Sequence, residues 1–199
     1  MNKDKVYIFL FDGFADWEIA YLSPHIVRTG KYRLSTFSKS GTPVLSMGGL
    51  AITPDGNLSD LDFAEMAMLV LPGGDAWERK EHSELAPLVK ATAEKEIPLA
   101  AICAATGFLA NEGLLDQIRH TSNSLEYLEK VSPSYRGQAN FLGGPNSLDP
   151  GAVQDGWLIT ASGTAPLAFA REIFSLLQIY SEPDIAKWYR LFTQGIWQD

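Results

Sequence analysis

Short apolar runs alternate along the chain with longer amphipathic stretches, as they do in βαβ units. The runs favour buried strands because they are short and rich in β-branched and aromatic residues. They predict strands over residues 5–10, 33–38, 67–71, 99–102, 119–122 and 157–160, with a hairpin or loop-strand over residues 44–53.

Apolar residues at helical spacing occupy the intervals between these runs. They predict helices over residues 16–28, 84–96, 105–111, 124–130, 166–177 and 184–192. Residues 132–155 are loop-rich, with turn signals at Gly143-Gly144-Pro145 and Asp149-Pro150-Gly151. The alternation predicts a single α/β domain over residues 1–199, a sandwich with a mostly parallel sheet, in which residues 183–199 form a C-terminal helical extension.

Composition mainly excludes function classes. The net charge of −8 and a pI near 4.9 argue against a nucleic-acid surface, which needs clustered Lys and Arg. No segment approaches the roughly 20 apolar residues that span a bilayer, and the early run over residues 6–11 is too short for a secretory signal. We therefore expect a cytoplasmic protein. A single cysteine excludes an internal disulfide and a multi-cysteine metal site, and no cofactor or metal is expected.

Cys103 stands where a predicted strand runs directly into a predicted helix. Ala101 and Ala105 flank it, and a nucleophile elbow needs small residues at these two places. A thiol at a helix N-terminus lies beside backbone N–H groups and the positive end of the dipole, so we expect its pKa to fall below the ordinary value of about 8.5. A lone cysteine can also be a small buried hydrophobe, but the turn favours a chemical role.

Glu18 is the partner that we expect for this thiol. It lies early in the first predicted helix, for which Asp16 fits the N-cap position. A carboxyl beside a thiolate has its pKa raised by burial and like charge, so it can stay protonated and donate to sulfur; such a pair titrates as a unit. Of the three histidines, His25 and His82 are expected to be solvated. Only His120 is expected near the site, with a structural role equally compatible.

Pro72-Gly73-Gly74 ends a neighbouring predicted strand. Glycines allow positive φ and a close approach of backbone N–H groups to a ligand, which can form an oxyanion hole without side chains. A plain strand-ending turn is the alternative. Because ligands bind at the carboxyl ends of parallel strands, we expect these glycines, Glu18 and Cys103 to meet on one rim.

Together these segments resemble the DJ-1/PfpI family, within the class I glutamine amidotransferase-like superfamily. The resemblance covers about residues 5 to 178 in order. It rests on Asp12-Gly13-Phe14 with Glu18, Leu71-Pro72-Gly73-Gly74, Ala100-Ala101-Ile102-Cys103-Ala104, Gly113-Leu114-Leu115-Asp116, and residues 156–163. It implies a flavodoxin-like three-layer sandwich, often a homodimer, with Cys103 as nucleophile and Glu18 as its hydrogen-bonding acid. It also implies that the N–H groups of Gly74 and Ala104 form an oxyanion site.

The chain departs from this family in its histidines. Protease-like members carry His directly after the cysteine, where this chain has Ala104, and many others carry a later His where the alignment places Asn123. Glutamine amidotransferases need a late His-x-Glu pair, which residues 160–166 lack. Peptidase and glutaminase activities are therefore not expected. Asn123 is expected to orient a substrate by hydrogen bonding, with Gly73, Gly74, Ala104 and His120 as further substrate-binding candidates.

Three functions remain compatible with these residues. The first is a hydrolase or lyase without a cofactor, in which Cys103 adds to a small aldehyde, thioester-like carbonyl or isonitrile while Glu18 shuttles the proton. The second is an oxidative-stress sensor in which Cys103 is oxidised to sulfinic acid. The third is a binding domain that keeps the fold without the chemistry. The expected partners are a small-molecule substrate and a second copy of the chain, with no nucleic acid and no membrane.

Overall fold

The computed structural model describes residues 3–143 and 151–196, in which seven strands form one sheet in the order β5-β2-β1-β6-β7-β9-β8. All neighbouring strands are parallel except β8, which is antiparallel to β9. The strands are β1 (Lys5–Phe9), β2 (Arg33–Ser38), β5 (Gly56–Asn57), β6 (Met66–Leu71), β7 (Leu99–Ile102), β8 (Ala152–Asp155) and β9 (Leu158–Ala161). The short strands β3 (Val44–Leu45) and β4 (Ala51–Ile52) form the predicted hairpin. The mostly parallel sheet is thus confirmed.

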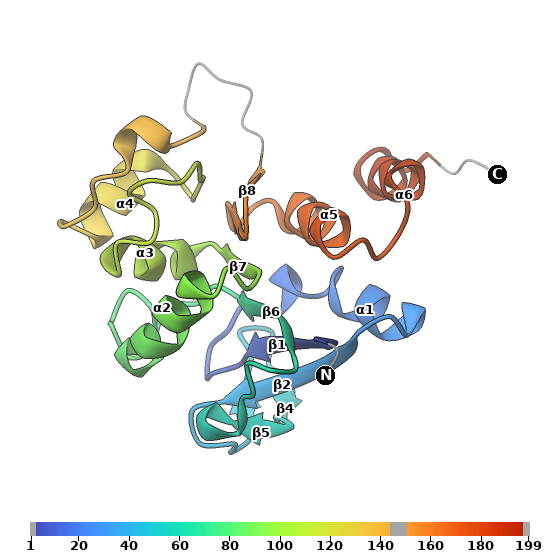
Figure 1. Ribbon diagram of the computed structural model, residues 1–199, viewed down its shortest axis with the longest axis horizontal. Coiled ribbons are helices and arrows are strands. Elements are labelled where there is room, and N and C mark those ends of the chain that lie inside the picture. Colours follow the sequence, from blue (N-terminus) through green and yellow to red (C-terminus); the bar gives the residue numbers. More distant parts are fainter. Residues whose placement is uncertain (1–2, 144–150, 197–199) are drawn as a thin grey trace.

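Helices cover both faces of this sheet, which gives the expected three layers. Figure 1 shows α2, α3 and α4 on one side of the strands and α1, α5 and α6 on the other. The bounds are α1 (Ser23–Thr29), α2 (Ala86–Glu94), α3 (Ala104–Asn111), α4 (Leu125–Val131), α5 (Pro166–Leu176) and α6 (Glu182–Gln194). Strands buried on both faces must be apolar throughout. The sequence MAMLVL of β6 meets this requirement, since all six of its residues are buried.

Two predicted helices are each divided in the structure. Residues 16–28 form a 3-10 turn, η1 (Asp16–Glu18), followed by α1, and residues 84–96 form η3 (Ser83–Leu85) followed by α2. Each α-helix has a proline in its first two positions. Proline lacks an N–H and is tolerated only at a helix start, so Pro24 and Pro87 mark new beginnings.

The predicted N-cap role of Asp16 is wrong, because its carboxylate instead accepts hydrogen bonds from the Ser46 hydroxyl at 2.5 Å and the Gly48 N–H at 3.1 Å. The predicted strand over residues 119–122 is also wrong. It is reduced to an isolated bridge between His120 and Phe141, and the Thr121 N–H donates to the Thr160 hydroxyl rather than to a neighbouring strand. Strands β5 and β8 were not predicted.

The C-terminal helix α6 packs against α5 and begins close to the predicted position. The His25 ring is hydrogen-bonded to the Tyr180 hydroxyl at 2.8 Å, which ties α1 to the segment before α6. Of the two turn signals in the loop-rich stretch, Gly143 and Gly151 have positive φ, and the residues between them lie outside the described part of the chain.

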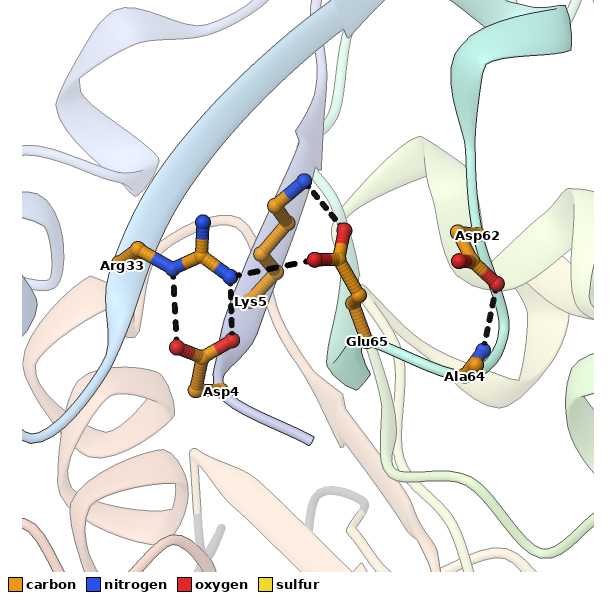
Figure 2. Close-up of polar contacts among 6 residues, drawn as sticks. All are labelled: Asp4, Lys5, Arg33, Asp62, Ala64 and Glu65. Atoms are coloured by element: carbon orange, nitrogen blue, oxygen red, sulfur yellow. Dashed lines mark hydrogen bonds and ion pairs between the residues drawn. The ribbon is translucent and has the colours of Figure 1, made fainter. Parts of the chain in front are cut away.

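An ion-pair cluster ties together the amino ends of the central strands (Figure 2). Arg33, which begins β2, donates to both carboxylate oxygens of Asp4 at 2.9 and 2.6 Å and lies 3.4 Å from Glu65. Glu65, just before β6, also pairs with Lys5 of β1 at 2.5 Å. Solvent-exposed pairs of this kind contribute little to stability individually, because water and salt screen them. They connect the amino ends of these strands, at the opposite end of the sheet from the carboxyl ends.

Among the described residues, no helix combines the length and apolar character needed to cross a membrane.

Candidate active site

Cys103 occupies a sharp turn between β7 and α3. Its backbone has φ 58° and ψ −130°, a conformation that side-chain-bearing residues rarely adopt. The turn is held on both sides, because the Cys103 N–H donates to the Ala161 carbonyl at 2.9 Å and its carbonyl accepts from the N–H and hydroxyl of Thr106. The thiol therefore projects at the carboxyl end of the sheet, and the predicted tight strand-to-helix turn is confirmed.

Glu18 approaches this sulfur from η1, which follows β1. Its side chain is 1% exposed, and one carboxyl oxygen accepts a 2.5 Å hydrogen bond from the Gly73 N–H. The Gly73 carbonyl in turn accepts from the Ala15 N–H at 2.9 Å. The backbone N–H and carbonyl of Gly73 thus both bind the segment that carries Glu18. Gly73 therefore positions the acid rather than offering its N–H to a substrate.

Two glycines enclose the Glu18–Cys103 pair. A Cβ on Gly73 would lie 2.9 Å from Glu18 Oε2 and 3.0 Å from Cys103 Sγ, and one on Gly163 would lie 3.2 Å from Glu18 Oε1 and 2.7 Å from the same sulfur. Neither position can carry a side chain without displacing the pair. Gly163 was not singled out as a site residue from the sequence, although its place just after a predicted strand, on the same rim, was an available signal.

The protonation states of Glu18 and Cys103 depend on burial and on each other. Burial raises the pKa of Glu18 to about 7, although the Gly73 N–H and the Cys103 thiol act to lower it. Burial and the charge of Glu18 raise the pKa of Cys103 to about 11, while the Asn123 amide and the Ala104 N–H act in the opposite direction. The raised pKa of Glu18 agrees with the sequence-based expectation. The expected lowering for Cys103 is wrong, because desolvation and the neighbouring carboxylate outweigh the helix N-terminus.

One consequence concerns where the proton resides. Between the pKa values of about 7 and about 11 the pair holds a single proton. In that range Cys103 becomes a thiolate only when this proton moves to Glu18.

Asn123 lies on the open side of the sulfur. Its Nδ2 donates toward Cys103 Sγ at 3.5 Å, and its Oδ1 accepts from the Gly163 N–H at 2.9 Å. The second bond fixes which end of the amide faces the sulfur. Asn123 can therefore donate to a thiolate or to a bound substrate, but it cannot remove a proton as an imidazole would.

Ala104 and Gly74 are the two remaining candidates for binding a substrate through a backbone N–H. The Ala104 N–H lies close enough to the sulfur to lower the pKa of Cys103. Gly74 has φ 152°, and a Cβ there would lie 2.6 Å from the Gly13 carbonyl oxygen and 2.7 Å from the Phe11 ring, so packing alone requires a glycine. An oxyanion role for the N–H groups of Gly74 and Ala104 stays a prediction.

All three histidines lie away from Cys103. His120 is buried, with Nδ1 bonded to the Ile118 carbonyl at 2.7 Å and Nε2 to the Tyr135 hydroxyl at 2.6 Å, so the structure does not bring it to the site. His82 is buried against aromatic rings, and His25 is partly buried and bonded to Tyr180. The expectation that His25 and His82 are solvated is wrong, because most of the aromatic rings that enclose them come from residues far away in the sequence.

Ser122, which follows His120 and Thr121, is buried and shares a 2.6 Å hydrogen bond with the Thr106 hydroxyl. It supports the turn of Cys103 through Thr106 rather than contacting the sulfur. Within residues 3–143 and 151–196, no cluster of three or more His, Cys, Asp or Glu side chains is arranged to hold a metal ion.

A model of the DJ-1/PfpI family matches residues 4–176. Two relatives from Bacillus subtilis (strain 168), YoaZ and YdeA, are both named uncharacterized proteases. YoaZ is 35% identical, over 96% of this chain and 91% of its own, and YdeA is 34% identical, over 92% and 88%. A solved DJ-1 superfamily protein from Agrobacterium tumefaciens superposes with a TM-score of 0.86 at 35% identity, over 96% of this chain and 98% of that chain. A ThiJ/PfpI family protein from Bacillus anthracis gives 0.87 at 33% identity, over 98% and 92%.

Proposed function

This chain belongs to the DJ-1/PfpI family, and we propose that it is a cysteine-dependent enzyme acting on a small electrophile of the aldehyde, carbonyl or isonitrile class. The observation that carries the proposal is the enclosed pair of Glu18 and Cys103. Cys103 supplies the nucleophile, and Glu18 is placed to accept the proton that the thiol must release, because burial raises the pKa of this carboxyl to about 7, near neutrality.

The chemistry is a proton-balanced addition. The thiol proton passes to Glu18, and the sulfur forms a bond to the electrophilic carbon. Glu18 then returns the proton to the substrate. An aldehyde becomes a hemithioacetal, with the proton on its oxygen, and an isonitrile becomes a thioimidate, with the proton on the carbon that sulfur attacks. Neither step needs an oxidant, a reductant or a metal. Asn123 and the Ala104 N–H support the negative sulfur by donating hydrogen bonds to it.

The proposed substrates are small because the surroundings of the sulfur are tight. A single added carbon on Gly73 or Gly163 would already overlap the thiol. The open direction is that of Asn123, an exposed residue whose amide faces Sγ. A substrate therefore approaches from this side and can accept a hydrogen bond from Asn123 as it reacts.

The word protease in the names of YoaZ and YdeA applies to those proteins. For this chain we propose no peptidase activity, because a cysteine peptidase needs an imidazole beside the thiol to protonate the departing amine. His120 uses both ring nitrogens elsewhere, and His25 bonds to Tyr180. His82 lies among aromatic rings.

The proposal is tested with a panel of small aldehydes, thioesters and isonitriles. Wild type should turn over at least one class, Cys103→Ser should abolish that turnover, and Glu18→Gln should reduce it while leaving the fold intact. A casein substrate serves as the peptidase control. Equal turnover by wild type and Cys103→Ser would refute the proposal. Cleavage of casein that depends on Cys103 would show that the protein is a peptidase instead.

An oxidative-stress sensor is the second candidate. The single cysteine in the sequence favours it, since a sulfenic acid without a resolving thiol proceeds to sulfinic acid. The raised pKa of Cys103 counts against it, because the thiolate is the form that peroxide oxidises. Intact mass after mild peroxide decides the matter: no oxygen adduct on Cys103 at doses that spare methionine removes this candidate.

A homodimer also remains a prediction. Four large apolar side chains of η1 and the β3–β4 hairpin are 43–56% exposed: Trp17, Leu45, Met47 and Leu50. We propose that a second copy covers them. Sedimentation of wild type and Leu50→Glu tests this, and a wild type that sediments as a monomer at micromolar concentration would refute it.

A further inference from the structure

His82 is a buried polar side chain that the proposed chemistry does not use. It is 8% exposed, and neither ring nitrogen has a hydrogen-bond partner among the described residues. Its ring centroid lies 5.0 Å from that of Phe9, 4.4 Å from Phe11 and 4.9 Å from Trp77. Buried polar groups are nearly always satisfied, and one that is not calls for a missing partner. Burial lowers the pKa of His82, so the neutral ring offers one donor and one acceptor.

A cavity of about 160 Å³ adjoins this ring, between residues 77–83 and helix α3. Cys103 and Glu18 do not line it; the residues that do are Trp77, Lys80, His82, Ser83, Phe108, Asn111 and Glu112, of which Glu112 is paired with Lys90 at 2.7 Å. The Trp77 and Phe108 rings lie 4.9 Å apart at an interplanar angle of 31° and give the cavity flat apolar walls. A cavity of roughly 150 Å³ has room for one benzene molecule, so this one, whose lining is part apolar and part polar, has room for a single six-membered ring that carries a polar substituent.

We propose that this cavity is a second small-molecule site, for an uncharged monocyclic aromatic or heteroaromatic ligand whose polar substituent forms a hydrogen bond with His82. The walls supply apolar contact for the ring, and the imidazole supplies the partner for the substituent. Both nitrogens of His82 are covered by neighbouring atoms, and the proposal therefore requires the imidazole to turn toward the cavity when the ligand binds.

Phenol and toluene form a matched pair of probes, because they share one ring and differ in the hydrogen-bonding group. Titration of each into the full-length protein, followed by NMR at the indole N–H of Trp77, gives two dissociation constants. Phenol should bind wild type about three- to tenfold more tightly than toluene, the ratio that one net hydrogen bond provides. His82→Phe keeps an aromatic ring in the cluster but has no polar atom, and it should remove the advantage of phenol.

Ser83→Leu is the control for the location of the site. Ser83 is an exposed residue of the cavity lining, so a larger side chain there should weaken both probes together without disturbing the buried rings. Thermal unfolding of each variant verifies that it is folded. The proposal is overturned if neither probe shifts the Trp77 signal saturably, if phenol has no advantage in wild type, or if its advantage survives in His82→Phe.

Discussion

Replacing Glu18 with Gln should change how the stability of the protein depends on pH. The carboxyl is buried, and burial raises its pKa from 4.5 to about 7. As pH rises through 4.5, the unfolded chain releases this proton while the folded protein still holds it, so stability falls until the pH passes the folded value near 7. The amide in the Glu18→Gln variant would stay neutral throughout and could still accept the Gly73 N–H.

The magnitude follows from the two pKa values of Glu18. A change from 4.5 to about 7 corresponds to about 3 kcal/mol in total, most of which is lost between pH 5 and pH 8. Relative to wild type, Glu18→Gln should therefore gain about 2–3 kcal/mol in stability over this range. All other titrating groups are common to both proteins and largely cancel in the difference.

Urea unfolding of both proteins at pH 5, 6, 7 and 8 measures this difference directly. Cys103→Ala, unfolded in parallel, shows how much of the effect depends on the thiol. A difference between wild type and Glu18→Gln that stays constant within about 1 kcal/mol from pH 5 to pH 8 would mean that Glu18 is ionised at an ordinary pKa in the folded protein. The shared-proton description of the site would then be wrong.

Four further outcomes are expected. Alkylation of Cys103 by iodoacetamide should rise with pH through about 7 to a plateau in wild type. Glu18→Gln should lack this plateau and rise only above the ordinary thiol pKa of about 8.5, as a pH-rate profile will show. Gly163→Ala places a carbon 2.7 Å from the sulfur and should cost about 1–3 kcal/mol in urea unfolding and slow alkylation. Asn123→Ala removes a donor to the thiolate and should slow alkylation at pH 8 by about three- to tenfold. His120→Phe leaves the Ile118 carbonyl and the Tyr135 hydroxyl without their hydrogen-bond partner, and should lower the free energy of unfolding by about 1–3 kcal/mol without changing the alkylation rate. Slower alkylation of Cys103 in this variant would instead place the imidazole in the site.

The fold was readable from the sequence where the hydrophobic pattern had one explanation. The strand at β7 was predicted with its observed bounds, and β6 began one residue before its predicted start, because continuous apolar runs of this length fit strands covered on both faces. The pattern failed where helical spacing continued across a new helix start, as at Pro24 and Pro87. It also failed at β5, whose two residues are too short to show any period.

The parts of the site that depend on nearby residues in the sequence could be predicted. Cys103 stood out through its neighbours along the chain, and the rim rule for parallel sheets linked it to Glu18. The contribution of Gly163 depends on a contact with residues far away in sequence, which no local pattern records. The direction of the Cys103 pKa was misjudged for the same reason: the helix N-terminus is visible in the sequence, but the extent of desolvation is not.

The backbone of Cys103 has a consequence for how this position can vary. At φ 58° and ψ −130° a residue with a Cβ is strained by about 1–3 kcal/mol, and glycine is not. Glycine usually stabilises a folded protein less than alanine does, and at this position we expect the opposite. The Cys103→Gly variant should therefore be more stable than the Cys103→Ala variant. Selection for thermal stability alone would drift toward glycine and lose the sulfur. The thiol at this bend is therefore kept at a cost in backbone strain that glycine would not carry.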